Sequence, residues 1–185
     1  MLKVEIKEKK FGDKQIFKDF ELSVTEAGVY AVTGASGRGK TTLLNIIAGL
    51  DNDFNGKVFA DGKTSYVFQE DRLLPWLNAL ENVAFVCRDN EKAAAMLKRL
   101  GLENETDARI SELSGGMKRR VAIARALAAE YDILLLDEPF SSVDESRKQQ
   151  IMDTVKELTE GKIVLLVTHD VREAQYLGAK MIDLE

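Results

Sequence analysis

The chain has 185 residues, of which 45% are hydrophobic, and this is enough to bury one sizeable core in a single domain spanning residues 1–185. Its 31 acidic residues outnumber its 26 lysines and arginines, and the net charge of −5 argues against broad electrostatic binding to nucleic acid or anionic lipid. The longest aliphatic runs are far shorter than the roughly 20 apolar residues that cross a bilayer, so any membrane role is expected to come through a partner.

Strand patterns dominate the first third of the chain. Alternating or aliphatic segments predict strands at residues 2–7, 20–24, 29–33, 57–59 and 65–68. A helix is expected between the third and fourth of these, because Leu43, Leu44 and Ile47 recur with helical spacing. The amino terminus alternates like a strand and carries charges where a secretion signal needs a continuous apolar stretch, so no such signal is expected.

Helical patterns dominate the middle of the chain. Asn78 followed by Glu81 is typical of a helix start, and Ala93 and Leu97 share one face of a second helix that Gly101 can end. A third helix is expected after residues 114–116 and runs to about residue 129. We expect its basic run, residues 118–120, to form a solvated helix face.

The last third returns to alternating strands and helices. Residues 133–136 predict a strand that is buried on both faces, and a helix follows that Gly161 closes. A strand at 163–167, a short helix after His169 and a final strand at 180–184 complete the pattern. Strands that alternate with helices predict an α/β fold with a mostly parallel sheet flanked by helices.

A complete phosphate-loop pattern lies between the third predicted strand and the helix after it. Its residues, extended by Thr42, are assigned to ATP binding: Gly34, Ala35, Ser36, Gly37, Arg38, Gly39, Lys40, Thr41 and Thr42. Glycines let backbone amides approach phosphate oxygens, and the amino terminus of the helix adds about half a positive charge. Lys40 can reach the terminal phosphates and Thr41 can ligate Mg²⁺. A glycine-rich turn without a ligand is the alternative, which the flanking strand and helix disfavour.

Two adjacent carboxylates follow the buried strand at 133–136. Ligands of open α/β sheets gather at the carboxyl ends of strands, which is where Asp137 and Glu138 are expected. Asp137 is suited to hold Mg²⁺, and Glu138 to accept a proton from, or to orient, the water that attacks the γ-phosphate. The alternative is a polar strand end, which is less plausible beside a complete phosphate loop.

A third motif is specific to one family. Leu113, Ser114, Gly115, Gly116 and Met117, followed by residues 120–127, resemble the signature segment of ATP-binding-cassette (ABC) ATPases. Gln69, Asp144 and His169 also occur in the order of that family's Q-loop, D-loop and switch histidine, so the resemblance covers essentially the whole chain. Met117 stands where the family usually has glutamine.

The resemblance implies a fold and a division of the chain. The fold is a P-loop NTPase of ABC type with a small antiparallel β lobe and a helical signature subdomain. The nucleotide-binding core is expected at residues 1–70 and 131–185, and the helical signature subdomain at 71–130. The signature residues Ser114 to Met117 are implied to contact the ATP held on a partner's phosphate loop, so that a second copy of the chain completes each site.

Four further residues have both a functional and an ordinary interpretation. Gln69 is implied to sense water or Mg²⁺, and His169 to contact the γ-phosphate or the attacking water, although a surface amide and a structural histidine are the alternatives. Phe11 stands where the family has an aromatic that stacks on adenine, but aromatic residues usually serve packing. Asp144 fits the D-loop and also the N-cap of the helix after it.

The resemblance implies an ATPase, with ATP and Mg²⁺ as cofactors, that couples closure of a dimer to solute transport. Residues 72–77 are implied to contact a transmembrane permease, and the segment 73–76, Leu-Leu-Pro-Trp, resembles the importers of nitrate, sulfonate and taurine. A cytoplasmic location on the inner face of the membrane and a solute-binding protein in the whole transporter follow from that likeness. A soluble ABC ATPase acting in DNA maintenance, translation or cofactor assembly is the alternative, and a nucleotide sensor without hydrolysis is a third.

Overall fold

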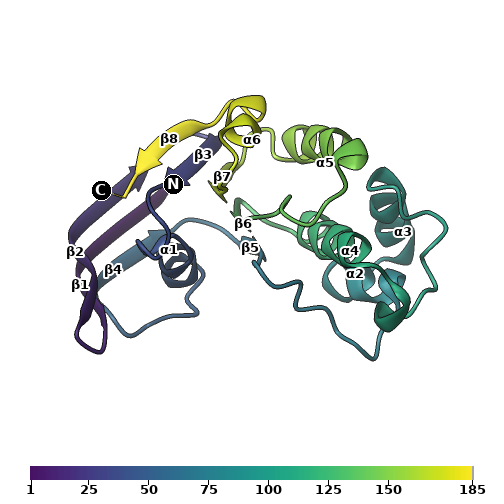
Figure 1. The fold of residues 1–185 in the computed structure, drawn as a ribbon, viewed down its shortest axis with the longest axis horizontal. Coiled ribbons are helices and arrows are strands. Elements are labelled where there is room, and N and C mark those ends of the chain that lie inside the picture. The colour runs from purple at the N-terminus through teal and green to yellow at the C-terminus, as the bar shows by residue number, and fades with distance from the viewer. Residues whose placement is uncertain (185) are drawn as a thin grey trace.

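A computed structural model of the chain describes residues 1–184 and contains two sheets with helices packed on them (Figure 1). The larger sheet has five strands in the order β5-β6-β7-β3-β8, and every neighbouring pair is parallel. Its strands are β3 (Gly28–Thr33), β5 (Thr64–Val67), β6 (Ile133–Asp137), β7 (Ile163–Val167) and β8 (Lys180–Asp183). The predicted parallel sheet is therefore confirmed.

The central strands β6 and β7 are buried along their whole length. Successive side chains of a strand point to opposite faces, so each strand contributes to two cores. In β6, Leu134 and Leu136 pack into one hydrophobic cluster, whereas Ile133 and Leu135 pack into the other. This is why both strands are runs of aliphatic residues without polar alternation.

The smaller sheet is antiparallel, with the order β2-β1-β4. It consists of β1 (Leu2–Phe11), β2 (Lys14–Val24) and β4 (Asn55–Ala60). Helix α1 (Lys40–Ile47) packs between the two sheets, in the hydrophobic cluster that also contains Ile133 and Leu135. β1 and β2 are longer than predicted, because they pair as a hairpin beyond the segments with alternating hydrophobic residues. The strand predicted at 65–68 ends one residue earlier, at Val67.

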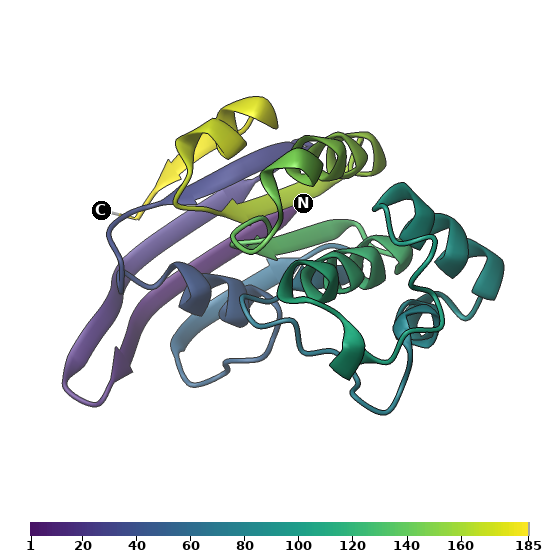
Figure 2. The same ribbon diagram turned by 45° about the vertical axis from the view of Figure 1, so that its right-hand side comes forward.

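The remaining helices lie on the other side of the parallel sheet from the antiparallel strands (Figure 1, Figure 2). They are α2 (Ala79–Cys87), α3 (Asn90–Arg99), α4 (Gly115–Ala128), α5 (Glu145–Leu158) and α6 (Val171–Tyr176), with a short 3-10 helix at Ile110–Glu112. The predicted start of α2 is confirmed: the Asn78 side chain accepts from the Glu81 amide at 2.8 Å, and the Glu81 carboxylate accepts from the Asn78 amide at 2.9 Å. No helix within residues 1–184 is long and apolar enough to span a bilayer.

The prediction of a solvated face at residues 118–120 is wrong for two of its three residues. Arg119 is only 1% exposed and Arg120 only 6% exposed. Both lie on the buried side of α4, where their guanidinium groups donate to backbone carbonyls instead of water. A charge can be buried when its donors are satisfied in this way, and the pattern of charges in the sequence does not reveal it.

Candidate functional site

Most of the predicted site residues come from four neighbouring positions along one edge of the parallel sheet. The glycine-rich loop follows β3, Gln69 follows β5, Asp137 ends β6, and His169 follows β7. Since β5, β6, β7 and β3 are adjacent and parallel, their carboxyl ends meet. A cleft of about 430 Å³ opens there. It is lined by Phe11, Lys14, Ile16, Ser36, Gly37, Gly39, Lys40, Thr41, Thr42, Gln69, Glu138, Val167 and His169.

The loop before α1 has the backbone that phosphate binding needs. Gly39, at the N-cap of α1, has φ of 102°, and a Cβ there would lie 2.5 Å from the Ile16 side chain. Only glycine fits, because the conformation is left-handed and the space is already filled. Lys40 Nζ donates to the carbonyls of Gly34 at 2.7 Å and Ala35 at 3.1 Å, so the ammonium group lies over the loop.

One predicted loop residue points elsewhere. The Arg38 side chain donates from Nε to the Leu184 carbonyl at 3.1 Å and does not line the cleft. Among the described residues of the loop, the side chains that do line the cleft include Ser36, Lys40 and Thr41.

Asp137 has the properties of a cation ligand. Its side chain is completely buried, and neither carboxylate oxygen makes a hydrogen bond to any residue in 1–184. Burial raises the pKa of the Asp137 carboxyl above its ordinary value, and the nearby Thr41 hydroxyl and Lys40 oppose this shift. A buried carboxylate without a partner beside a hydroxyl offers the hard oxygen ligands that Mg²⁺ prefers. The residues present therefore fit Mg²⁺.

The side chains of Glu138 and His169 are in contact at the cleft. His169 Nε2 lies 2.9 Å from Glu138 Oε1, and the two side chains are 56% and 21% exposed. Glu138 has φ of +47°, a left-handed conformation that is uncommon for a residue with a side chain. Its amide donates to the Val167 carbonyl at 2.8 Å, which joins the end of β6 to the end of β7. A carboxylate in close contact with an imidazole, both open to the cleft, is suited to move a proton from a bound water.

Phe11 lines the cleft and is 53% exposed, so it is not a core residue. Lys9, which the sequence did not single out, has its Nζ 4.5 Å from the centre of the Phe11 ring and is itself 1% exposed. The Lys9 ammonium is held by Asp51 Oδ1 at 2.8 Å and by the Asp53 carbonyl at 2.6 Å. No motif marks Lys9, Lys14 or Ile16, because their positions depend on how β1 and β2 pair beside the loop.

Ser114 to Met117 do not line the cleft. Ser114 is the N-cap of α4, where its hydroxyl accepts from the Met117 amide at 3.2 Å, and the two glycines form the first turn. A Cβ on Gly116 would lie 3.0 Å from the Ser142 carbonyl, so this turn packs tightly on the loop before α5. The amino terminus of α4 therefore offers amide groups at a place separate from the cleft of the same chain.

Asp144 also lies outside the cleft. It is the N-cap residue of α5, as one of its two interpretations predicted, but its side chain makes no capping hydrogen bond. Asp144 therefore does not cap the first-turn amides of α5 with its side chain, and its carboxylate is left for another contact.

Known proteins are similar to this chain over nearly its whole length. The sequence profile of the family described as ABC transporter matches residues 17–141. The aliphatic sulfonates import ATP-binding protein SsuB 1 of Xanthomonas axonopodis pv. citri (strain 306) is 40% identical over 200 residues, covering 98% of this chain and 79% of that protein. The taurine import ATP-binding protein TauB of Pseudomonas aeruginosa (strain UCBPP-PA14) is 37% identical over 190 residues, covering 93% of this chain and 72% of that protein.

Solved structures of ATP-binding cassettes are also similar to this chain. The dimeric post-hydrolysis structure of the ATP-binding cassette MJ0796 bound to ADP and Pi superposes with a TM-score of 0.89 at 33% identity, covering 100% of this chain and 94% of that one. A second dimeric structure of MJ0796, described as a bacterial ABC transporter cassette, has a TM-score of 0.88 at 32% identity. The chain therefore belongs to the ABC transporter family and is an ATPase that works with ATP and Mg²⁺.

Proposed function

We propose that this ATPase is the energy-coupling subunit of an importer for a small solute and that it hydrolyses ATP in a dimer with two shared sites. One observation carries the proposal: Lys40, Gln69, Glu138 and His169 surround a single cleft, whereas the signature turn at Ser114 lies outside it. A nucleotide in the cleft would thus need the signature turn of a second chain to enclose its phosphates. The dimeric form of the MJ0796 cassette supports this arrangement.

The predicted site residues at the cleft have distinct tasks in the proposed reaction. The loop amides and Lys40 bind the phosphates, and Asp137 with Thr41 holds Mg²⁺. Mg²⁺, when bound, neutralises charge on the phosphate oxygens. Glu138 accepts the proton of the attacking water, and His169 orients the Glu138 carboxylate through the 2.9 Å contact. The Gln69 amide contacts the water or the metal ion at the end of β5, and Phe11 stacks on the base.

We assign residues 1–70 and 131–185 to a nucleotide-binding core and residues 71–130 to a helical signature subdomain. The packing of the helices supports this division, because α2, α3 and α4 contact one another more extensively than they contact the sheet. ATP would close the dimer and hydrolysis would reopen it, so that movements at the sheet edge reach the signature turn.

Residues 72–77 are the proposed contact for the permease. Trp76 is 75% exposed, more than any other large apolar side chain among residues 1–184, so its ring is available to a partner. The subunit would then sit on the inner face of the membrane, attached through the permease rather than by a span of its own. A solute-binding protein would complete the transporter.

The relatives support the choice of solute. SsuB 1 is an import ATP-binding protein for aliphatic sulfonates and TauB is one for taurine, which is itself a sulfonate. We therefore propose a small organosulfonate as the imported solute. These names also favour the transporter over a soluble ABC ATPase.

Substitution of Glu138 tests the catalytic assignment. Glu138→Gln keeps the shape of the side chain but cannot accept a proton, so turnover is expected to fall by about a hundredfold or more. ATP binding is expected to persist, and the variant should elute as a dimer in size-exclusion chromatography with Mg-ATP. Glu160→Gln is the matched control, since Glu160 is exposed two residues after the end of α5 and does not line the cleft.

The outcomes separate chemistry from transport. Unchanged turnover in Glu138→Gln together with no ATP-dependent dimer would show that the catalytic assignment is wrong. For the cellular role, the chain should copurify from its native membrane with permease subunits, and ATP turnover of that complex should rise with taurine or an alkanesulfonate and a solute-binding protein. A soluble nucleic-acid complex would refute the transporter role.

A further inference from the structure

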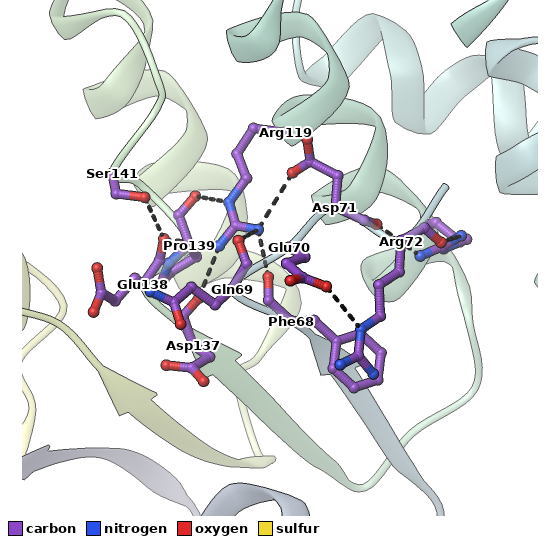
Figure 3. Close-up of polar contacts among 11 residues, drawn as sticks. Phe68, Gln69, Glu70, Asp71, Arg72, Arg119, Asp137, Glu138, Pro139 and Ser141 are labelled. Carbon is purple, nitrogen blue, oxygen red and sulfur yellow. Dashed lines mark hydrogen bonds and ion pairs between the residues drawn. The ribbon is translucent and has the colours of Figure 1, made fainter. Parts of the chain in front are cut away.

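Arg119 connects the two loops that carry the proposed catalytic residues (Figure 3). It is the largest fully buried side chain among residues 1–184, and it reaches from α4 into the edge of the sheet where β5 and β6 end. Within residues 1–184, five of its six hydrogen-bond acceptors are backbone carbonyls, so a single guanidinium group replaces the water that these carbonyls would otherwise bind.

Three of these contacts hold the loop after β6. Nη2 donates to the carbonyls of Asp137 at 2.8 Å and Glu138 at 2.7 Å, and Nε donates to the carbonyl of Pro139 at 2.9 Å. Glu138 has the left-handed backbone noted above, a conformation that costs free energy and persists only when its surroundings hold it. Arg119 supplies such a constraint at the carbonyl of the strained residue itself.

The other contacts hold the loop after β5. Nη1 donates to the carbonyls of Phe68 and Gln69, the latter at 3.3 Å, and lies 3.4 Å from Asp71 Oδ1. The two loops are adjacent because Val67 pairs with Leu136 in the sheet. The rigid planar fork of an arginine can contact both loops at once, which a single ammonium group cannot.

A second arginine of α4 extends the attachment. Arg125 Nη1 donates to the Arg72 carbonyl at 2.9 Å, and Nη2 donates to the Asp71 carbonyl at 3.2 Å. The segment 68–72 is therefore tied to α4 at both ends. Since α4 begins at the signature turn, the same helix contacts the proposed catalytic loops of its own chain and carries the surface proposed to meet the partner's ATP.

We propose that Arg119 is a positioning residue for ATP hydrolysis: its guanidinium fork fixes the backbones of Gln69 and Glu138 relative to each other and to α4. The inference rests on the proposed roles of Gln69 and Glu138. Arg119 touches neither the phosphate loop nor the cleft, so it acts through these two residues and not on the nucleotide.

The chain offers a matched control in the next residue. Arg120 is also buried in α4 and also donates to carbonyls, those of Leu100 at 3.0 Å and Gly101 at 2.7 Å, but these follow α3 and lie away from the cleft. A role limited to filling the interior of the protein predicts the same behaviour for both arginines. A positioning role predicts a loss of turnover for Arg119 alone.

The test compares Arg119→Gln, Arg119→Lys and Arg120→Lys by steady-state ATP hydrolysis, with turnover expressed per nucleotide-binding site counted from ATP stoichiometry. We expect kcat to fall about tenfold or more in both Arg119 variants while KM for Mg-ATP stays within about twofold, because the phosphate loop is untouched. Arg119→Lys should retain more stability than Arg119→Gln without recovering kcat. Arg120→Lys should lower the unfolding temperature and leave kcat within about twofold.

The kcat values of the same variants can also contradict the proposed role of Arg119. An unchanged kcat in Arg119→Lys, or an equal loss of kcat in Arg120→Lys, would overturn it. If Arg119→Gln does not fold, Arg119→Lys alone decides. Adding Arg119→Gln or Arg119→Lys to Glu138→Gln should cause little further loss, since both changes act on the same step. If Glu138→Gln itself is fully active, the proposed catalytic role fails, which is a separate result.

Discussion

Asp137 combines complete burial with the absence of any hydrogen bond to its carboxylate from residues 1–184. Burying a charge without a partner costs free energy, so this residue destabilises the nucleotide-free protein. The raised pKa of the Asp137 carboxyl has the same cause. Binding of a cation would offset this cost, which is the behaviour expected of a metal ligand.

Asp137→Asn should therefore separate stability from function. We expect the free energy of unfolding of the nucleotide-free protein to rise by about 1 kcal/mol, because a buried carboxylate is replaced by a neutral amide. Turnover should be lost, and Mg²⁺ should no longer add to the stabilisation by ATP in thermal unfolding.

The control is Asp132→Asn, at the other end of β6. Asp132 is 53% exposed and accepts from the Lys63 amide at 2.9 Å, so its replacement should lower stability slightly and leave Mg²⁺ dependence intact. A loss of stability in Asp137→Asn comparable to that of the control would contradict the assignment of Asp137 as an unsatisfied cation ligand.

At the scale of single elements, two helices begin in different ways. The start of α2 has a complete capping box between Asn78 and Glu81, whereas the N-cap of α5, Asp144, makes no side-chain hydrogen bond. A sequence pattern alone cannot distinguish these cases, since aspartate and asparagine are both common N-caps. The difference has a measurable consequence for stability.

Asn78→Ala is expected to lower the free energy of unfolding by about 1 kcal/mol, the usual contribution of a formed N-cap. Asp144→Ala should have a clearly smaller effect, because no capping bond is lost. Urea unfolding followed by circular dichroism measures both. Equal losses would mean that the Asp144 carboxylate caps α5 after all.

At the scale of the whole molecule, the cleft and the exposed Trp76 are linked through one segment of chain. The segment 68–72 begins at the cleft edge, is held on α4 by Arg119 and Arg125, and continues to the exposed tryptophan. Such a path can carry a change in the nucleotide site to a surface that a permease would cover.

Trp76→Ala tests this link. We expect the variant to fold with unchanged stability, because the side chain is 75% exposed, but to copurify with permease subunits in much lower yield. Phe59→Ala is the control, since Phe59 is 53% exposed and lies on β4 in the antiparallel sheet. Equal yields for both variants would place the permease contact elsewhere.

The local patterns of the sequence were sufficient for much of the fold and for the motif residues. Glycine spacing before an amphipathic helix, an aliphatic strand ending in Asp137 and Glu138, and a lone histidine after another such strand are all local features. Each depends on interactions between near neighbours, which is why their elements were predicted to within a few residues. The outer halves of β1 and β2 were missed because strand pairing, not hydrophobicity, maintains them there.

Only the tertiary structure decided which charged residues are buried and what they hold. Residues 118–120 suggested a solvated face, yet Arg119 joins loops that are about fifty and about twenty positions away in the chain, at Phe68 and Asp137. Lys9 beneath Phe11 is a similar case. The charged groups in these contacts donate to backbone carbonyls of distant segments. Every residue has such a carbonyl, so the sequence does not show which ones accept.

The sequence by itself determined the phosphate loop, the carboxylates and the family. The fold decided how Gln69, Glu138 and His169 are held around one cleft, because strand order and not chain order sets their distances.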